Sequence, residues 1–386
     1  MAGAAAHLTT LKIFHLINDL DTGGAEMMLY KLLAGTNRQR FSHVVVSMTD
    51  AGILSRPVEA LGVPVHALSM HRGVLNLAGM VRLLRLLRRE RPDVLQAWLY
   101  HANLLGIIAA RLTRVPAIAW NIRCSDMDMR YYSRRSALVV RLLAWLSPLP
   151  DAVLINTETG RKFHEGLHYR PRQWHVIPNG FDVSLFRPDP AARLHYRKIF
   201  GLPLNPVLIG LIARYDPMKD HPTFLQAASY LLKDRSDVHF VLVGRNVTES
   251  NKDLTAIIQE LGIADRVHLL GERSDVPEIM RSLDILALTS VSEGFPNVIG
   301  EAMASGVPCA VTDVGDVALV IGETGKVVPI RNPHALAQAW SELIDMGLEG
   351  RRRLGIAARH RIGQLFSLPT VVTQYETLYE QLVARP

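Results

Sequence analysis

Two carboxylates, Glu293 and Glu301, stand eight positions apart in the stretch SEGFPNVIGEA (292–302). Glu293 directly follows a predicted strand, and the residues GFPN form a tight turn before a predicted helix that contains Glu301. Carboxylates accept hydrogen bonds, and backbone N–H groups at the start of a helix bind anions or hydroxyl groups. This spacing therefore suits a site for a hydroxyl-rich ligand. The alternative is that Glu293 only caps the helix and that Glu301 is a surface residue.

The elements that must position these carboxylates alternate between strands and helices along the chain. Apolar runs of strand length, each followed by a helical pattern, cover residues 11–17, 43–48, 64–68, 93–98, 116–122 and 152–157, and then 206–213, 238–244, 266–271, 284–290 and 306–315. Strands separated by helices predict parallel βαβ units. We therefore expect an α/β protein with two Rossmann-like domains facing each other across a cleft, because ligands of such sheets bind at the carboxyl ends of the strands.

The composition is that of a globular protein with room for two domains. The chain has 386 residues, of which 48% are hydrophobic and 20% charged. It contains no apolar run of the ~18–20 residues that a membrane-spanning helix needs, and its start lacks the pattern of a signal peptide. Two cysteines, Cys124 and Cys309, are too few for a disulfide framework or a cysteine-rich metal site. We expect a reduced, cytoplasmic setting.

The net charge of +7 is concentrated in the first half of the chain. Residues 1–185 contain 22 Lys and Arg against 13 Asp and Glu, and the stretches 80–93 and 130–146 combine arginines with leucines at helical spacing. One interpretation is a solvated helix face over a core. A second is peripheral attachment to an anionic membrane surface. Nucleic acid is the least favoured partner, because the sequence has no nucleic-acid-binding motif.

Several motifs occur in an order that resembles the retaining glycosyltransferases of family 4, which have the GT-B fold. The Glu-x7-Glu motif is followed by the rest of EAMASGVPCAVTDVG (301–315). The other matching stretches are NDLDTGGAE (18–26), VIPNGFD (176–182), ARYDPMKDHPTFLQA (213–227), LVGRN (242–246) and HLLGERSDVPEIM (268–280). The resemblance covers nearly the whole chain, and it implies a nucleotide-sugar donor and a saccharide or lipid-linked acceptor.

The resemblance also implies a division into two domains with different roles. A Pro-, Asn- and Asp-rich segment near 184–205 predicts the linker. We expect an acceptor-side domain over 1–185 and a donor-binding domain over 186–365. In this fold the closing helix crosses back, so we assign 366–386 to the surface of the first domain.

Three residues receive catalytic roles from the resemblance. Arg214 and Lys219 match the basic pair that holds the nucleotide diphosphate, and both would offset the charge that builds on the leaving group. Glu293 matches the residue that contacts the donor sugar. The alternative is that Arg214 and Lys219 are exposed cations on a loop, without a role in the site.

The remaining donor contacts follow from the same resemblance. Glu301 would accept hydrogen bonds from the ribose hydroxyls, and the backbone of the GFPN turn would contact the sugar and phosphate. The full set of predicted donor-binding residues is Gly24, Arg245, Gly271, Arg273, Gly294, Phe295, Pro296, Asn297, Val298 and Glu301. Gly24 lies in the TGGAE loop, which lacks the G-x-G-x-x-G spacing of a dinucleotide site. Arg245, Gly271 and Arg273 are the candidates for contacts near the base.

The acceptor side departs from the family pattern. Many relatives have a histidine at the end of the strand 116–122, whereas this chain has Asn121, followed by Arg123. His101 could take the place of that histidine or be structural. We assign His101, Asn121 and Arg123 to the acceptor and sugar side.

The resemblance implies a retaining transferase that moves a sugar from a UDP- or GDP-sugar to an acceptor hydroxyl, without a metal ion or another cofactor. Two alternatives stay open: a nucleotide-sugar epimerase or hydrolase of the same fold, and a non-catalytic nucleotide-sugar-binding protein. We expect a cytoplasmic enzyme of cell-surface polysaccharide or glycolipid synthesis, with attachment to the inner face of the membrane as a further option.

Overall fold

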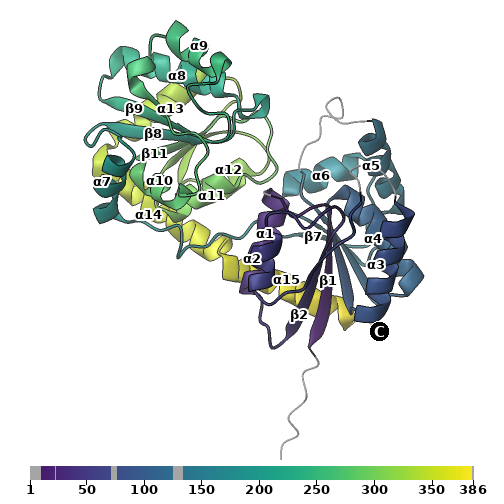
Figure 1. Cartoon of the computed structure of the whole chain (residues 1–386). Helices are drawn as coiled ribbons and strands as arrows, with labels where there is room; N and C mark the ends of the chain where they lie inside the picture. The colour runs from purple at the N-terminus through teal and green to yellow at the C-terminus, as the bar shows by residue number, and fades with distance from the viewer. Residues whose placement is uncertain (1–9, 22, 71–75, 125–133, 385–386) are drawn as a thin grey trace, which may run out of the picture. The chain divides into compact units, whose positions relative to one another are not determined.

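The computed structural model describes residues 10–21, 23–70, 76–124 and 134–384. The chain divides into two compact units (Figure 1). Unit 1 comprises Met1–Gly180 and Leu368–Pro386, and unit 2 comprises Phe181–Ser367. Each unit is a Rossmann-like α/β domain built on a parallel sheet, as the alternation of strands and helices predicts. The chain enters unit 2 after Gly180 rather than after residue 185, because Phe181 and Phe186 are buried in the core of unit 2.

The described residues of unit 1 form a seven-stranded parallel sheet in the order β3-β2-β1-β4-β5-β6-β7. The strands are β1 Leu11–Ile17, β2 Phe41–Ser47, β3 Val65–Ala67, β4 Val94–Trp98, β5 Ala117–Ile122, β6 Ala152–Ile155 and β7 Trp174–Val176. Alternate side chains of β1 enter different cores: Phe14 and Leu16 enter one, and Ile13 and Ile17 enter the other. Burial on both faces explains why the strands read as continuous apolar runs.

Helices cover both faces of this sheet. They are α1 Gly24–Gly35, α2 Ser55–Ala60, α3 Leu77–Glu90, α4 Tyr100–Thr113, α5 Arg134–Leu146, α6 Glu158–Gly166 and α15 Leu368–Val383. α3, α4 and α5 share one core with the sheet, and α1, α2 and α15 share the other. Figure 1 shows α15, the last helix of the chain, against the sheet of unit 1, where it contacts β4.

The described residues of unit 2 form a six-stranded parallel sheet in the order β10-β9-β8-β11-β12-β13. The strands are β8 Val207–Ile212, β9 Val238–Val243, β10 Val267–Leu269, β11 Ile285–Leu288, β12 Cys309–Thr312 and β13 Gly325–Val328. The strand order reverses between β8 and β11, which are neighbours in the sheet. Such a switch point is where α/β sheets bind ligands, outside the carboxyl ends of the strands.

Two sets of helices pack on this second sheet. The helices are α7 Pro190–Ile199, α8 His221–Asp234, α9 Lys252–Glu260, α10 Val276–Ser282, α11 Asn297–Ala304, α12 Val317–Ile321, α13 Pro333–Asp345 and α14 Gly347–Leu365, with short 3₁₀ turns at Pro217–Lys219 and Ala264–Arg266. α10, α11, α12 and α14 share one core with the sheet, and α8, α9 and α13 share the other.

The linker predicted over 184–205 is wrong, because the whole segment belongs to unit 2 and contains the helix α7. Asp189 caps the helix, since its side chain accepts a hydrogen bond from the Ala192 N–H, and Pro190 stands in the first turn. An Asp-Pro pair at this place begins a helix, because proline tolerates the first helical position and lacks an N–H that would need a partner. Arg197 anchors the helix through a fully buried side chain.

No helix in the described part of the chain is long and apolar enough to cross a membrane.

Candidate active site

The loop after β8 carries Arg214 and Lys219, as predicted. The Ala213 N–H donates to the Val243 carbonyl at 2.8 Å, and the Tyr215 N–H donates to the Arg245 carbonyl at 2.8 Å, so the loop stays joined to the end of β9. The Arg214 side chain is 60% exposed, and its Nη2 lies 2.9 Å from Asp216 Oδ2. The guanidinium is therefore held at the carboxyl edge of the sheet and reaches into solvent.

Asp216 orients this loop although the sequence reasoning gave it no role. Its Oδ1 accepts from the Met218 N–H at 2.9 Å and starts the 3₁₀ turn that ends at Lys219. Partial burial alone would raise the pKa of Asp216, but the Met218 N–H and the Arg214 guanidinium hold it below its usual value. The carboxylate thus stays charged and keeps both basic residues in place.

Lys219 and Glu293 form an ion pair, although they are far apart in sequence. The Ser290 hydroxyl donates to Glu293 Oε1 at 2.6 Å, and the Thr289 hydroxyl donates to the Lys219 carbonyl at 2.7 Å. The Lys219 side chain is 20% exposed and that of Glu293 is 12% exposed. The fold therefore brings two of the three predicted catalytic residues into contact, at the carboxyl ends of the neighbouring strands β8 and β11.

The GFPN turn is anchored by its phenylalanine. The Phe295 ring is buried. It stacks on Phe181, with centroids 6.1 Å apart, and is tilted against Phe366, with centroids 6.0 Å apart. The ring thus belongs to the core, so a contact of this residue with a ligand would come from its backbone. The donor contacts of residues 294–297 stay a prediction. Pro296 is buried, and Asn297 begins α11, where Val298 and Glu301 are half-buried in the first two turns.

Gly315 supports the turn from the loop after β12. Its φ of +55° favours glycine, and a Cβ at this position would lie 2.8 Å from the Glu293 carbonyl oxygen. The close approach of two backbones therefore fixes the turn that carries Glu293. The sequence reasoning missed this residue and Ser290. Both signals were present, since Ser290 stands three positions before Glu293 and Gly315 ends the quoted motif 301–315.

Arg245 and Gly271 lie on joined loops at the carboxyl ends of β9 and β10. The Gly244 N–H donates to the Gly271 carbonyl at 2.8 Å, and the Gly271 N–H donates to the Val247 carbonyl at 3.0 Å. Gly271 has a φ of +69°. Arg245 is exposed, with its Nε 3.5 Å from Glu272 Oε1. These contacts place Arg245 and Gly271 together at the same edge as Arg214.

Arg273 is held in a different way. Its guanidinium bonds to Asp275 and lies over the Phe200 ring, 5.3 Å from the centroid. The pKa of Arg273 is raised, chiefly by the hydrogen bond to Asp275. The side chain is thus engaged by α7 and by its own loop, which gives it a structural role beside the predicted contact with the base.

Unit 1 carries the residues predicted on the acceptor side, and Gly24 and His101 lie at helix starts after β1 and β4. Gly24 is exposed in the first turn of α1. His101 is half-buried in the first turn of α4, and burial lowers its pKa. Leu99, the residue before α4, has a φ of +72°, a strained value for a side chain with a Cβ. The turn that presents His101 is therefore tightly determined.

Asn121 lies near the end of β5 and Arg123 follows the strand, as predicted, but both side chains form a hydrogen-bond network inside unit 1. The Asn121 Nδ2 donates to the Tyr375 hydroxyl at 3.1 Å, and Arg123 bonds to the same hydroxyl at 3.4 Å and to Asn179. The Arg123 guanidinium lies 5.7 Å from the Trp98 ring centroid. These contacts give both residues a structural role, because they tie α15 to the end of β5.

The TGGAE loop contains a buried carboxylate that the sequence reasoning left aside. Glu26 stands in the first turn of α1, and burial raises its pKa. A Cβ on Gly23 would lie 2.2 Å from Glu26 Oε2, so a larger residue at this position would require the Glu26 side chain to move. Thr22 lies outside the described residues.

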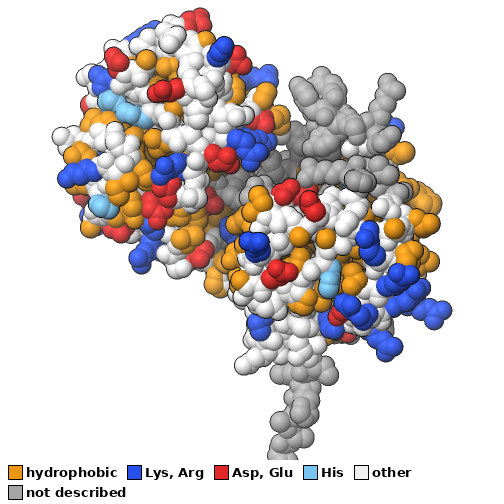
Figure 2. Space-filling view, in the orientation of Figure 1, with side chains coloured by type: hydrophobic (Ala, Val, Ile, Leu, Met, Phe, Trp, Pro, Cys, Tyr) orange, Lys and Arg blue, Asp and Glu red, His pale blue; other side chains and the backbone are white. Residues whose placement is uncertain are grey.

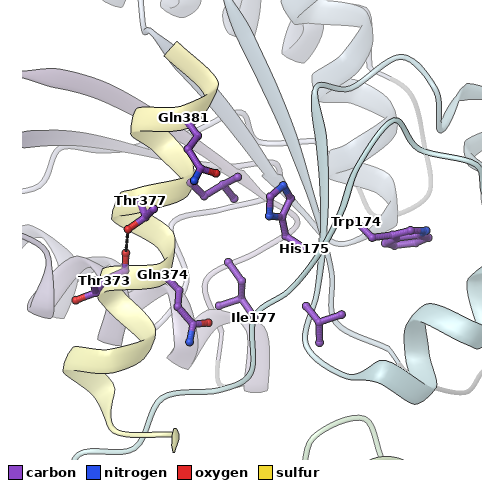
Figure 3. A pocket seen from close by; sticks show the side chains of 9 residues that line it. Trp174, His175, Ile177, Thr373, Gln374, Thr377 and Gln381 are labelled. Carbon is purple, nitrogen blue, oxygen red and sulfur yellow. Dashed lines mark hydrogen bonds between the residues drawn. The ribbon is translucent and has the colours of Figure 1, made fainter. Parts of the chain in front are cut away.

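The described residues contain no group of three or more His, Cys, Asp or Glu side chains that could hold a metal ion. They do contain a hollow of about 400 Å³ between β7 and α15. Figure 3 shows His175 and Ile177 pointing toward the polar side chains of α15, while the Trp174 ring points away from that helix. The described residues that line this hollow include none of the predicted site residues, so it is separate from the edge that carries Lys219 and Glu293.

Two family models match the chain, one in each half. Residues 22–185 match the model "Glycosyltransferase Family 4", and residues 206–346 match the model "Glycosyl transferases group 1". Both models agree with the resemblance seen in the motifs.

Curated relatives of this chain are also glycosyltransferases. A lipopolysaccharide core biosynthesis mannosyltransferase, LpcC of Rhizobium leguminosarum bv. viciae, is 30% identical over 65% of this chain and 68% of its own length. The UDP-Gal:alpha-D-GlcNAc-diphosphoundecaprenol alpha-1,3-galactosyltransferase of Escherichia coli is 29% identical over 70% of this chain and 71% of its own length. Among solved structures, Anabaena HepE in complex with UDP matches with a TM-score of 0.84 and 23% identity, over 96% of this chain and 100% of HepE.

Proposed function

Since this chain belongs to the family 4 glycosyltransferases of the GT-B fold, we propose that it moves a sugar from a UDP- or GDP-sugar to an acceptor hydroxyl with retention of configuration. The observation that carries the proposal is the Lys219–Glu293 pair, held beside Arg214 at the carboxyl edge of the unit 2 sheet. UDP-sugars are the first donors to test. The name of the E. coli relative specifies UDP-Gal, and a HepE structure contains UDP-glucose.

Sugar transfer requires positive charge at the place where the diphosphate leaves. As the bond from the sugar C1 to the diphosphate oxygen breaks, negative charge grows on the diphosphate, and Lys219 and Arg214 offset it. The acceptor oxygen bonds to C1 on the same face, and its proton passes to the leaving phosphate oxygen. Glu293 is paired with Lys219 in the free enzyme. When Lys219 binds the diphosphate, Glu293 would lie next to the donor sugar and contact it.

In this proposal the cationic side chains supply the electrostatic stabilisation, so transfer needs no metal ion. The acceptor is a saccharide or a lipid-linked saccharide. The relatives' names support this class of acceptor, because they include a diphosphoundecaprenol-linked sugar and a lipopolysaccharide core. The site of action is then the cytoplasm or the inner face of the membrane.

The test is donor turnover by the purified full chain with UDP- and GDP-sugars and a pool of saccharide and lipid-linked acceptors, in buffer that contains EDTA. Lys219→Ala should lower kcat by ~10²–10³, because it removes a central electrostatic contact. Lys326→Ala is the matched control, since Lys326 also pairs with a glutamate of unit 2, Glu342, at an exposed position. The control should keep the wild-type rate.

Three results would contradict the proposal. Lys219→Ala could retain turnover within about tenfold of the wild type, or EDTA could abolish transfer by the wild type. A product with inverted configuration at C1, seen by NMR, would refute the retaining mechanism. Rapid hydrolysis or epimerisation of the donor without an acceptor would instead favour the alternative enzyme of the same fold.

A further inference from the structure

The outer surface of α3, α4 and α5, together with the short loop after α5, has two chemical features that the transfer reaction does not use. We call it the outer helical face. It carries large apolar side chains in contact with solvent, which are Leu77, Ile108, Leu112, Leu138, Leu142, Trp145 and Leu149. It also carries exposed arginines, which are Arg82, Arg85, Arg88, Arg89, Arg111, Arg114 and Arg141. This combination calls for a partner that is both apolar and negatively charged.

The apolar residues form stripes rather than scattered spots. On α5, Leu138, Leu142 and Trp145 recur at spacings of four and three residues, which places them on one side of the helix, and Leu149 follows in the loop just beyond it. Trp145 is 77% exposed and Leu138 is 67% exposed, whereas Leu143 on the opposite side is fully buried. α5 is therefore apolar on its outer side as well as on the side that packs in the core.

Neighbouring helices extend the stripe. On α4, Ile108 and Leu112 stand one turn apart, and Leu112 is 60% exposed. The Arg111 Nη2 donates to the Leu149 carbonyl at 2.8 Å, which fixes the end of α4 against the loop that follows α5. The apolar stripes of the two helices are thus parts of one surface.

Positive charges outnumber negative charges on this face. α4 and α5 contain no acidic residue, and α3 contains Glu90, which is paired with Lys12 and Arg89. Figure 2 shows blue side chains gathered over the region of α3 and orange side chains next to them. A protein partner of ordinary composition would have to supply acidic and apolar groups in the same pattern, whereas an anionic bilayer presents both in layers.

Two hollows lie on the outer helical face or at its border, where α4 ends. One, of about 340 Å³, is lined in part by Arg111, Arg114 and Arg172. The acidic residue in its wall, Asp151, already accepts from the Ile118 N–H at 2.9 Å. The other, of about 430 Å³, is lined by Leu77, Ala78 and Val81 with Arg82 and Arg85. The first suits a phosphate group, and the second suits an apolar chain below a phosphate.

We propose that the outer helical face docks on an anionic lipid bilayer. Arginines of α3 and α4 contact lipid phosphates, the hollow at Arg111, Arg114 and Arg172 receives one phosphate, and Trp145 enters the boundary between head groups and acyl chains. Tryptophan favours that boundary because its ring is apolar and its N–H is polar. The binding does not depend on sugar transfer, so the experiments below use no sugar nucleotide and remain informative if the proposed transferase activity fails.

The first experiment uses tryptophan fluorescence of the full chain. Trp98, Trp120 and Trp340 are fully buried and Trp174 is half-buried, so a change on adding vesicles reports mainly on Trp145. Vesicles of phosphatidylcholine with phosphatidylglycerol should shift the emission to the blue, and brominated acyl chains should quench it. Phosphatidylcholine vesicles alone should do neither. Trp145→Phe should abolish both effects while the protein still binds.

The second experiment measures partition into the same vesicles by flotation. Arg82→Gln/Arg85→Gln/Arg114→Gln should weaken binding by ~100-fold, since each basic residue near an anionic surface contributes roughly fivefold. The matched control is Arg56→Gln/Arg352→Gln/Arg353→Gln, which removes the same charge from exposed positions outside this face and should bind like the wild type. High salt should weaken the binding of the wild type.

Several outcomes would overturn the proposal. These are no binding to anionic vesicles, equal binding to neutral vesicles, equal losses in the two triple variants, or an emission spectrum that vesicles leave unchanged. Self-association that Trp145→Ser abolishes, in a chain that ignores vesicles, would assign the face to a second copy of the protein instead.

Discussion

Replacing Arg197 by methionine should weaken unit 2 far more than the same change at Arg193. Both arginines bind the carboxylate of Asp284, the residue before β11: Arg197 Nη2 lies 2.5 Å from one oxygen and Arg193 Nη2 lies 2.6 Å from the other. The difference is burial. The Arg197 side chain is 0% exposed and that of Arg193 is 27% exposed.

The size of the stability loss follows from the buried groups that lose their partner when Arg197 is replaced. Its guanidinium donates to the Ser282 carbonyl at 3.0 Å and to the Leu204 and Pro206 carbonyls at 2.9 Å each. Removing one partner of a buried ion pair typically costs ~3–5 kcal/mol, because the other charge stays buried. For a domain of this size that corresponds to a fall of about 6–20 °C in melting temperature. Arg193→Met should cost about 1 kcal/mol or less, since its pair is partly open to water.

Hydrogen exchange of the β8 and β11 amides measures the free energy of opening in unit 2 alone, which separates it from unit 1. Arg197→Met should lower this free energy by the amount given above, and Arg193→Met should leave it nearly unchanged. Equal losses in the two variants, or a loss below about 1 kcal/mol for Arg197→Met, would refute the reasoning from burial.

Two further predictions concern stability. Burial lowers the pKa of His43, which lies next to His15, to about 3. The unfolded chain therefore takes up a proton below the ordinary pKa of 6.5 that the folded chain does not take up, so His43 alone should cost unit 1 about 2 kcal/mol of stability between pH 7 and pH 5. In urea unfolding, His43→Gln should reduce the pH dependence by that amount, and a variant with the pH dependence of the wild type would contradict the prediction. Gly300→Ala would place a Cβ 2.1 Å from the Phe181 ring, so thermal unfolding should show unit 2 losing ~1–3 kcal/mol; an unchanged melting temperature would show that the ring moves freely.

Much of the fold could be predicted because its signals are local. The apolar run 11–17 is β1 residue for residue, and the other predicted strands overlap β2 to β6 and β8 to β12. The strands β7 and β13, which are three and four residues long and lie at sheet edges, were missed. The segment 184–205 was misread because Pro and Asp mark helix starts as well as linkers.

The site was predictable where it follows strand ends and not where it depends on contacts across the fold. Lys219 and Glu293 were each placed by the motif, but their ion pair needs β8 and β11 to be neighbours, which no local pattern states. Asn121 and Arg123 were assigned to the acceptor side because Asn121 occupies the place of the histidine that many family members have at the end of this strand, and Arg123 follows it. A tyrosine from the far end of the chain, Tyr375, covers them in unit 1.

The last helix also sets the order in which the protein can be completed on the ribosome. Unit 1 needs α15, whose side chains Val371, Tyr375, Leu378, Tyr379 and Leu382 are buried in its core. All of Phe181–Ser367 is translated before that helix appears, which at ordinary rates of synthesis takes roughly 10–40 s. During this interval the nascent unit 1 exposes an apolar groove, while unit 2, continuous in the chain, has every residue it needs. A chain that stops just before Leu368 would therefore still fold unit 2, whereas its unit 1 would keep the apolar groove exposed and available to chaperones.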